Sequence, residues 1–188
     1  MAPQIIGIVG LPGSGKTEVA RVFAELGAPS VRMGDVVWEE LRRRGKEITE
    51  SNVARVSNEL RRREGMGAIA KRCIPIIRRV GKGQQAVIVD GIRGIAEVEV
   101  FRKSFGENFH LIGCWSSQIT RYRRTSSRKR DDDTGDLRSF HRKDKRELSW
   151  GLGDALALAD FIIVNEGSLR ELEERARELF KKIMEGCR

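Results

Sequence analysis

The chain has 188 residues, with 36 Lys and Arg against 27 Asp and Glu, which gives a formal net charge of +9. This length suits one domain of about 100–200 residues. Hydrophobic residues make up 39% of the chain, enough for a core, so a disulfide-dependent miniprotein and a disordered chain are excluded. The excess positive charge predicts a polyanionic partner but does not distinguish nucleic acid, acidic lipid and a phosphorylated small molecule.

Cysteine use and hydropathy bear on the compartment. Cys73, Cys114 and Cys187 form no C-x-x-C pair, and we expect them to be reduced apolar residues of a cytoplasmic protein. No apolar run approaches the roughly 20 residues of a membrane-spanning helix, and the N-terminus lacks the basic region and cleavage site of a signal peptide. We therefore expect a soluble protein without a membrane partner.

Apolar runs separated by helical patterns indicate the fold class. Apolar residues recur at helical spacing in residues 18–26, 95–105 and 169–183. Short continuous apolar runs are typical of strands in a buried parallel sheet. These strands are predicted at Gln4–Val9, Ser30–Met33, Ala86–Asp90, Phe109–Trp115 and Phe161–Val164. Because strands and helices alternate, the class is α/β.

Two segments interrupt this alternation without adding a strand. We interpret residues 35–80 as a helical insert, with helices at Val36–Arg44, Asn52–Glu64 and Gly67–Arg79, the last bent or broken near Pro75. Residues 116–149 are poor in apolar side chains, and we interpret them as a mobile lid. No repeat or flexible linker occurs, so we expect residues 1–188 to form a single domain with these inserts.

A phosphate-binding loop follows the first predicted strand. Residues 10–17 read Gly-Leu-Pro-Gly-Ser-Gly-Lys-Thr, which matches the pattern G-x-x-x-x-G-K-[ST], and a helical pattern follows. Glycines let backbone N–H groups converge on phosphate oxygens, and a helix N-terminus adds positive charge there. Lys16 is predicted to reach the β- and γ-phosphates, and Thr17 to bind Mg²⁺. The predicted nucleotide ligands are Gly10, Gly13, Ser14, Gly15, Lys16 and Thr17.

Two acids lie at the ends of predicted strands, on the edge where ligands of open α/β sheets bind. Asp90 ends the third strand, where it would order Mg²⁺ or would only open a turn with Gly91. Asp35 follows the second strand. It would order a Mg²⁺-bound water, accept a proton from an acceptor hydroxyl, or only cap a helix. Arg93, close after Asp90, would clamp an acceptor phosphate.

The lid begins with a run of cations. Arg121 to Arg130 contains six Lys and Arg residues and no acid, and these would repel one another unless an anion is present. We expect Arg121, Arg124, Arg128 and Arg130 to neutralise charge as the lid closes over a triphosphate. A solvated basic face is the alternative for any one of them.

Together these motifs resemble the nucleoside monophosphate kinase group of P-loop proteins, and most closely a mainly archaeal adenylate-kinase-related family. The resemblance covers essentially the whole chain. It implies a P-loop NTPase fold of three αβα layers, with a five-stranded parallel sheet in the order 2-3-1-4-5, a helical acceptor-binding insert and a lid. It also implies ATP and Mg²⁺ as cofactors.

Departures from adenylate kinase leave the acceptor open. Met33 and Trp38 replace a threonine and an arginine that flank the Gly-Asp of adenylate kinase, and Glu97 stands where that enzyme reads adenine with a glutamine. Other segments look like dephospho-CoA kinase, namely Gln118-x-x-Arg121 and residues 159–167. In those enzymes the second segment borders the adenine of ATP, so the resemblance makes Asn165 and Gly167 candidate base-site residues.

The sequence predicts an ATP- and Mg²⁺-dependent phosphotransferase whose acceptor is nucleotide-like, either a nucleoside monophosphate or dephospho-CoA. The alternative is a nucleotide-dependent, RNA- or ribosome-associated ATPase or binding protein, which the net charge favours and the lack of an aromatic-rich stacking motif disfavours. The predicted catalytic residues are Lys16, Asp35, Asp90, Arg93, Arg124 and Arg128, and the metal residues are Thr17, Asp90 and Asp35. Arg121, Asn165 and Gly167 join the loop as predicted cofactor-binding residues.

Overall fold

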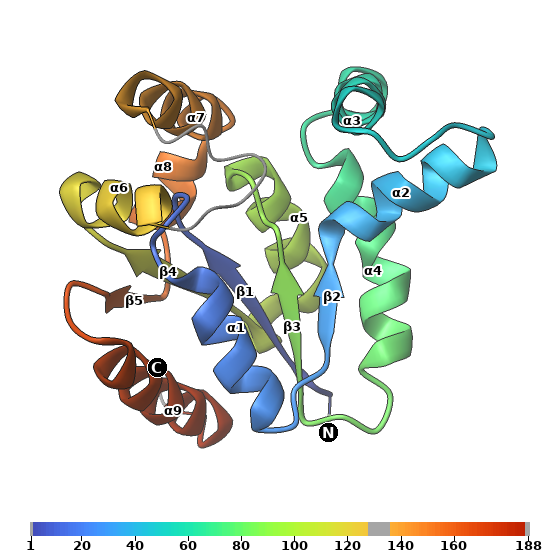
Figure 1. Ribbon diagram of the computed structural model, residues 1–188. Coiled ribbons are helices and arrows are strands. Elements are labelled where there is room, and N and C mark those ends of the chain that lie inside the picture. The colour runs from blue at the N-terminus through green and yellow to red at the C-terminus, as the bar shows by residue number, and fades with distance from the viewer. Residues whose placement is uncertain (1, 128–135, 187–188) are drawn as a thin grey trace.

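A five-stranded, all-parallel sheet forms the centre of the computed structural model, which describes residues 2–127 and 136–186 (Figure 1). The strand order is β2-β3-β1-β4-β5, which confirms the order that the resemblance implied. The strands are β1 (Gln4–Val9), β2 (Ser30–Arg32), β3 (Ala86–Asp90), β4 (Phe109–Trp115) and β5 (Phe161–Val164). Because the strands are parallel, their carboxyl ends meet at one edge, where the loop after β1 also begins.

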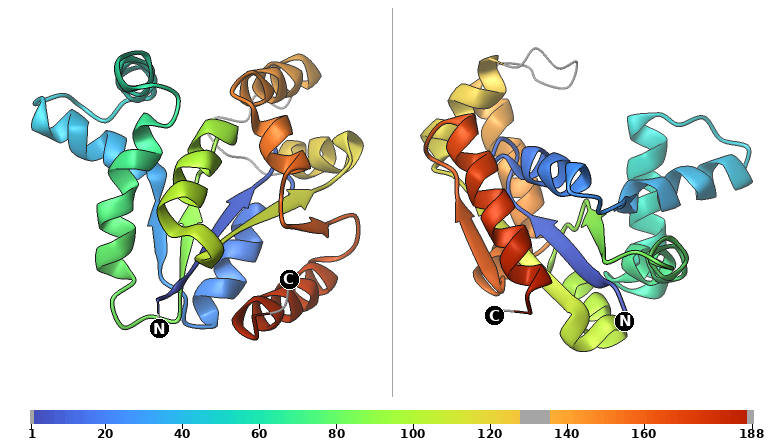
Figure 2. Two further views of the ribbon diagram at one scale, coloured as in Figure 1. Left: turned by 180° about the vertical axis from the view of Figure 1, so that it is seen from behind. Right: turned by 90° about the horizontal axis from the view of Figure 1, so that it is seen from below.

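Helices follow the strands and cover both faces of the sheet. Figure 2 shows α1 and α9 on one face and α4 and α5 on the other. The helices are α1 (Lys16–Glu25), α2 (Met33–Arg43), α3 (Glu50–Glu64), α4 (Ala68–Val80), α5 (Ile95–Phe105), a 3₁₀ turn at Gly106–Asn108, α6 (Gln118–Ser127), α7 (Leu137–Ser149), α8 (Leu152–Ala157) and α9 (Leu169–Met184).

Alternation along the strands divides the core into two layers. In β1, Ile5 and Val9 pack with α4 and α5, whereas Ile6 and Ile8 pack with α1 and α9. Both sets of side chains are almost fully buried. A strand that is apolar on both faces is what the continuous apolar runs predicted, and the three-layer αβα fold is confirmed.

Two local expectations were wrong. The second strand ends at Arg32 instead of Met33, and α2 begins at once, so Asp35 lies in the first turn of that helix and Arg32 occupies the N-cap position. Helix α4 continues unbroken through Pro75. Pro75 is exposed, and the helix remains anchored by buried Cys73 and Ile77 on its other side. Packing of an apolar helix face outweighs the hydrogen bond that a proline removes.

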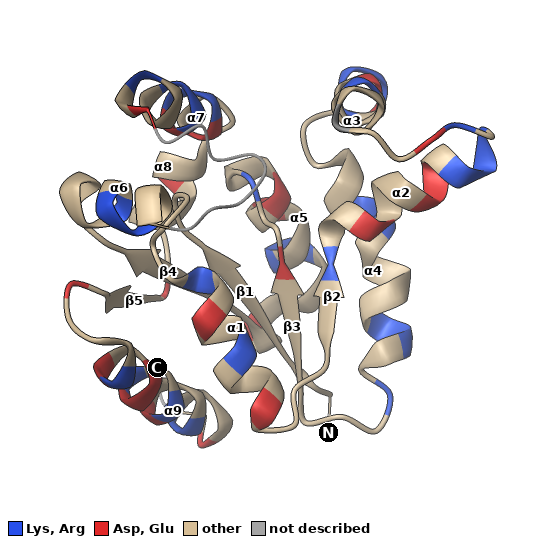
Figure 3. Ribbon diagram, viewed as in Figure 1, with Lys and Arg blue, Asp and Glu red and all other residues tan. Residues whose placement is uncertain are grey.

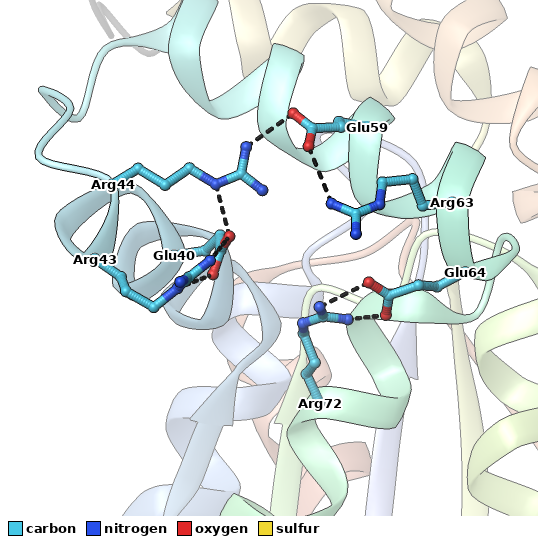
Figure 4. Close-up of polar contacts among 7 residues, drawn as sticks. All are labelled: Glu40, Arg43, Arg44, Glu59, Arg63, Glu64 and Arg72. Atoms are coloured by element: carbon cyan, nitrogen blue, oxygen red, sulfur yellow. Dashed lines mark hydrogen bonds and ion pairs between the residues drawn. The ribbon is translucent and has the colours of Figure 1, made fainter.

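An ion-pair network ties the three helices of the insert together (Figure 4). Arg44 of α2 bonds Glu40 of its own helix, with Nε–Oε1 2.6 Å, and Glu59 of α3, with Nη1–Oε2 2.8 Å. Arg72 of α4 bonds Glu64 of α3. Arg44 therefore joins α2 to α3, and Arg72 joins α3 to α4.

A search of the described residues for a helix both long and apolar enough to cross a membrane found none.

Candidate nucleotide site

The loop between β1 and α1 has the backbone shape that its glycines permit. Gly13 and Gly15 have φ values of +81° and +99°, a region that side chains rarely adopt. A Cβ at Gly13 would lie 2.9 Å from the carbonyl oxygen of Arg121, and one at Gly15 would collide with the Asn165 side chain. Gly10, where the loop begins, packs against the backbone of Cys114. The loop therefore requires glycine both for its conformation and for its close contact with α6 and the β5–α9 connection.

Ser14 anchors the loop to the sheet edge. Its carbonyl oxygen accepts hydrogen bonds from Cys114 Sγ at 3.0 Å, Ser116 Oγ at 3.3 Å and Asn165 Nδ2 at 2.9 Å. Its own hydroxyl is buried and has no partner within the described part of the chain. A buried hydroxyl without a partner carries a desolvation cost, which a bound ligand oxygen would relieve.

Lys16 and Asp90 lie beside the loop at the carboxyl ends of β1 and β3. Burial lowers the pKa of Lys16 and nearby Arg93 lowers it further, whereas Glu147 and Asp90 oppose the shift. Within the described ranges, no carboxylate lies within ion-pair distance of the Lys16 ammonium. Thr17, the next residue of α1, is exposed to solvent. This arrangement leaves a cation that favours an incoming anion.

Asp35, another predicted site residue, forms its ion pair outside the phosphate loop. It is exposed on α2 and forms an ion pair with Arg32, with Oδ1–Nη2 3.1 Å. The structure thus gives it a local partner, and the interpretation of Asp35 as an N-cap was wrong because Arg32 holds that position.

Arg121 connects the predicted lid, residues 116–149, to the phosphate loop. Its guanidinium is buried, and it donates bidentately to Asp144 of α7, with distances of 2.8 and 2.6 Å. It also donates to the carbonyl oxygen of Pro12 at 3.2 Å. The sequence indicated that the cations of this run would repel one another without an anion. For Arg121, that anion comes from the next lid helix, so the structure gives it a positioning contact.

Arg124 and Asn165 line a groove next to Gly15. Arg124 donates to the backbone carbonyl of Asn165 at 3.1 Å, to its side-chain oxygen at 3.2 Å and to the carbonyl of Gly167 at 3.3 Å. Leu169 and Leu172 add apolar surface to the groove, whose volume is about 230 Å³. A planar guanidinium, an amide and apolar walls beside a phosphate loop are suited to a nucleobase.

Arg93 belongs to a second polar cluster, on the β3–α5 connection. Its Nη1 donates to both carboxylate oxygens of Glu147 at 2.9 and 2.8 Å, and its backbone N–H donates to buried Glu97 at 2.7 Å. Burial raises the pKa of Glu97, while the hydrogen bond from Arg93 and the charge of Arg61 oppose the shift. The cluster joins the insert, the sheet edge and the lid.

Two predicted lid residues remain to be placed, and three residues in or next to the predicted lid were not predicted. Arg128 and Arg130 lie outside the described residues. The sequence reasoning did not identify Asp144, Glu147 and Trp150, although Phe140, Asp144 and Glu147 recur at a helical spacing that marks one buried face of α7. The available signal was this spacing, which places Asp144 and Glu147 on the same helix face as Phe140. It was easily missed because the rest of the helix is also strongly charged.

The described residues fit a bound nucleoside triphosphate. The loop offers a glycine-lined cradle, an unpaired buried hydroxyl and a buried ammonium. Across the two described ranges, no group of three or more His, Cys, Asp and Glu side chains could hold a metal by itself. This agrees with Mg²⁺ chemistry, since that ion is commonly held by one or two protein groups together with substrate phosphates.

Proteins of several organisms are similar to this chain over almost all of its residues. The AAA domain family matches residues 9–137. An Archaeoglobus fulgidus protein named UPF0200/UPF0201 is 48% identical over 180 residues, which cover 96% of this chain but 56% of that protein. The chain therefore spans little more than half the length of that relative. A UPF0200 protein of Methanosarcina mazei is 43% identical over 182 residues, covering 97% of this chain and 96% of the relative.

Several solved structures with the same fold are named as small-molecule kinases. Dephospho-CoA kinase from Campylobacter jejuni superposes with a TM-score of 0.64 at 14% identity, covering 98% of each chain. A gluconokinase from Sinorhizobium meliloti gives a TM-score of 0.59 at 15% identity, covering 98% of this chain and 95% of that one. Shikimate kinase from Acinetobacter baumannii, in complex with shikimate, gives 0.56 at 19% identity, covering 96% and 94%. At such identities the likeness establishes the fold alone.

Proposed function

The chain belongs to the UPF0200 family and has a P-loop kinase-like fold, and from this premise we propose that it transfers a phosphoryl group from ATP to a nucleotide-like small molecule. The observation that carries the proposal is the state of Lys16. Its side chain is half-buried beside a glycine-lined loop, its pKa is lowered, and within the described residues no carboxylate pairs with it. Such a cation is stabilised by a bound phosphate.

The residues would divide the work as follows. Lys16 and the loop amides would hold the β- and γ-phosphates, while the groove beside Arg124, Asn165 and Gly167 would receive the base. Thr17 and Asp90 would hold Mg²⁺, which supplies charge neutralisation on the phosphates.

Other residues would act on the acceptor and on the closed state. Arg93 would position the acceptor. Asp35 would accept a proton from an acceptor hydroxyl or order a metal-bound water. Arg121 would keep the lid on the loop through Asp144 and Pro12, and we propose that Arg128 adds positive charge when the lid closes. Closure excludes water, so transfer is favoured over hydrolysis.

Two acceptors satisfy this proposal, a nucleoside monophosphate and dephospho-CoA. The likeness to dephospho-CoA kinase in fold and in the residues around Asn165 supports the second. The helical insert supports the first, and so does the Asp90-Gly91-Ile92-Arg93 segment, which resembles the Asp-Gly-Phe-Pro-Arg of adenylate kinase with one residue deleted. Glu97, however, replaces the adenine-reading glutamine of that enzyme.

The direct test incubates the protein with Mg²⁺–ATP and each of AMP, GMP, CMP, UMP and dephospho-CoA, and measures ADP together with phosphorylated product. We expect one acceptor to raise ADP formation above background hydrolysis, and Lys16→Ala to abolish that increase. Lys181→Ala, at an exposed lysine of α9, is the matched control. Failure of every acceptor, or full turnover by Lys16→Ala, contradicts the proposal.

A second candidate function, RNA binding, is supported by helix α4. Residues 65–89 contain five Lys and Arg and no acid. Figure 3 shows basic segments and no acidic segment on α4. Arg72 pairs with Glu64, whereas Arg78, Arg79 and Lys82 are exposed and have no ion-pair partner within the described ranges. A row of unpaired cations on a helix is suited to a phosphate backbone.

RNA binding is tested by titrating a labelled RNA at several salt concentrations. We expect affinity to fall steeply with salt, and the combined Arg78→Gln, Arg79→Gln, Lys82→Gln variant to reduce the slope of that dependence. Equal binding by the variant and the parent protein would exclude α4 as an RNA surface.

A further inference from the structure

Three arginines from three parts of the fold surround one indole ring. The guanidinium carbons of Arg61 in α3, Arg93 after β3 and Arg146 in α7 lie 5.5, 5.9 and 5.7 Å from the centre of the Trp150 ring. Two buried carboxylates, Glu97 and Glu147, accompany them. We call these five charged residues and Trp150 the arginine cluster. Its three positive charges exceed its two negative charges by one.

The two carboxylates of the cluster differ in how firmly they are held. Glu97 lies in the first turn of α5 and accepts a backbone hydrogen bond from Arg93 at 2.7 Å as well as a contact from Arg61 at 3.4 Å. A negative charge at a helix N-terminus is favourable. Glu147 instead lies in the last turn of α7, where a negative charge is unfavourable. It pairs with the side chains of Arg93 and Arg146, the latter at 3.7 Å. Glu147 is therefore the carboxylate that can exchange.

The exchangeable carboxylate lies close to the phosphate loop. Arg93, Glu147 and Asp90 all influence the charge state of Lys16, so Glu147 lies near the cation that would hold the γ-phosphate. The cavity between Arg61, Arg93 and Trp150 measures about 10 Å³, which leaves room for no more than one water. In this conformation, side chains of the protein fill the space next to the transfer site.

We infer that the arginine cluster is the binding site for an anionic group of the acceptor, a phosphate monoester or a carboxylate, and that Glu147 occupies this site until the acceptor displaces it. The inference rests on the proposed function and adds the chemical class of the acceptor. The Glu147 carboxylate accepts two hydrogen bonds from Arg93 Nη1 and lies 3.7 Å from Arg146 Nη2, and an anionic group of the acceptor would reproduce these contacts. An acceptor anion that takes Arg93 Nη1 takes the nitrogen that now bonds Glu147, so its binding would release Glu147 and open the contact between the lid and the β3–α5 connection.

Competition of this kind has a measurable signature. For a ligand that must displace an internal group, the apparent Kd equals the intrinsic Kd divided by the fraction of molecules in which the site is free. Glu147→Gln removes the competing charge and keeps the shape of the side chain. Glu147→Asp keeps a carboxylate and should lie close to the parent protein. Arg93→Gln removes the group for which both anions compete.

Trp150 reports binding directly. In a Trp38→Phe, Trp115→Phe background, the emission of Trp150 is followed while AMP, shikimate or adenosine is added in the presence of a non-hydrolysable ATP analogue and Mg²⁺. AMP carries a phosphate monoester, shikimate a carboxylate, and adenosine no charge. We expect Glu147→Gln to lower the Kd of one anionic probe by about fivefold or more, and Arg93→Gln to raise it by about tenfold or more. Adenosine should bind no more tightly to Glu147→Gln than to the parent.

The probe that responds identifies which anion the site accepts, and Glu99→Gln on the exposed side of α5 should leave every Kd unchanged. Circular dichroism checks that each variant is folded, and Glu147→Asp serves as the folded control if Glu147→Gln is not. An anion affinity that is unchanged or weaker in Glu147→Gln overturns the inference, as does failure of both anions to bind that variant. Binding of the ATP analogue in the same samples tests the proposed function separately, because its loss would contradict nucleotide binding itself.

Discussion

Replacing Asp144 with asparagine would leave the buried guanidinium of Arg121 without a negative partner. Both side chains are less than a tenth exposed, at 5% and 9%, and their closest atoms are 2.6 Å apart. Removing one member of such a buried pair costs about 3–5 kcal/mol, because the charge that remains is no longer compensated. For a chain of this size, that corresponds to a fall in Tm of about 6–20 °C.

The chain supplies a matched control for this prediction. Arg170 and Glu174 of α9 form an ion pair of similar length, 2.8 Å, but their side chains are 87% and 55% exposed. Glu174→Gln should therefore change stability by less than about 1 kcal/mol. The assay is thermal unfolding followed by circular dichroism and by calorimetry, at one pH and one salt concentration for both variants.

A double variant separates loss of the pair from loss of packing. Arg121→Met with Asp144→Leu removes both charges and keeps apolar volume, so it should recover much of the stability lost in Asp144→Asn. A fall in Tm for Asp144→Asn no larger than that for Glu174→Gln would refute the reasoning. So would a double variant as unstable as Asp144→Asn.

Three further outcomes can be measured independently. Gly15→Ala should abolish ATP binding in calorimetric titrations, because its φ of +99° and the nearby Asn165 side chain leave no place for a methyl group; binding at parental affinity would contradict this. Glu40→Gln should destabilise the protein by about 1 kcal/mol at pH 7 in urea unfolding, and the difference should shrink towards pH 2. Hydrogen bonds from Arg43 and Arg44 lower the pKa of Glu40 from 4.5 to about 2, so its stabilisation is fully present above pH 4.5 and is lost as the pH falls through about 2. A difference as large at pH 2 as at pH 7 would be contrary evidence. In a Cys187→Ser variant, the native protein should not react with a thiol reagent at pH 8. The reason is that burial raises the pKa of Cys73 to about 12 and that of Cys114 to about 11. Rapid labelling of the folded protein would count against this prediction.

The centre of the sheet could be predicted from the sequence because β1, β3 and β4 are buried on both faces. A continuous run such as Ala86–Val89 has few alternatives to a central parallel strand, and the glycines of the loop fix where β1 ends. The boundaries of α2 and the continuity of α4 depend on packing between distant segments. Local rules therefore allowed an N-cap at Asp35 and a break at Pro75, neither of which occurs.

The phosphate loop could be placed from sequence, but the electrostatic partners of the lid could not. Arg121 and Asp144 are separated by a stretch of chain that no local pattern bridges, and Arg93 and Glu147 are further apart still. Whether an arginine contacts substrate or a carboxylate of its own chain is decided by how α6 and α7 pack. Composition records the charges of those helices and not their pairing.

The carbonyl of Ser14 has a thermodynamic consequence for nucleotide binding. Three donors from β4, its following residues and the β5–α9 connection fix this oxygen and hold the turn in one shape before any ligand arrives. The loss of backbone freedom thus accompanies folding of the sheet and is not repeated when a nucleotide binds. Destabilising β5 should consequently weaken nucleotide affinity through entropy, although β5 is not among the segments that we propose to hold the phosphates.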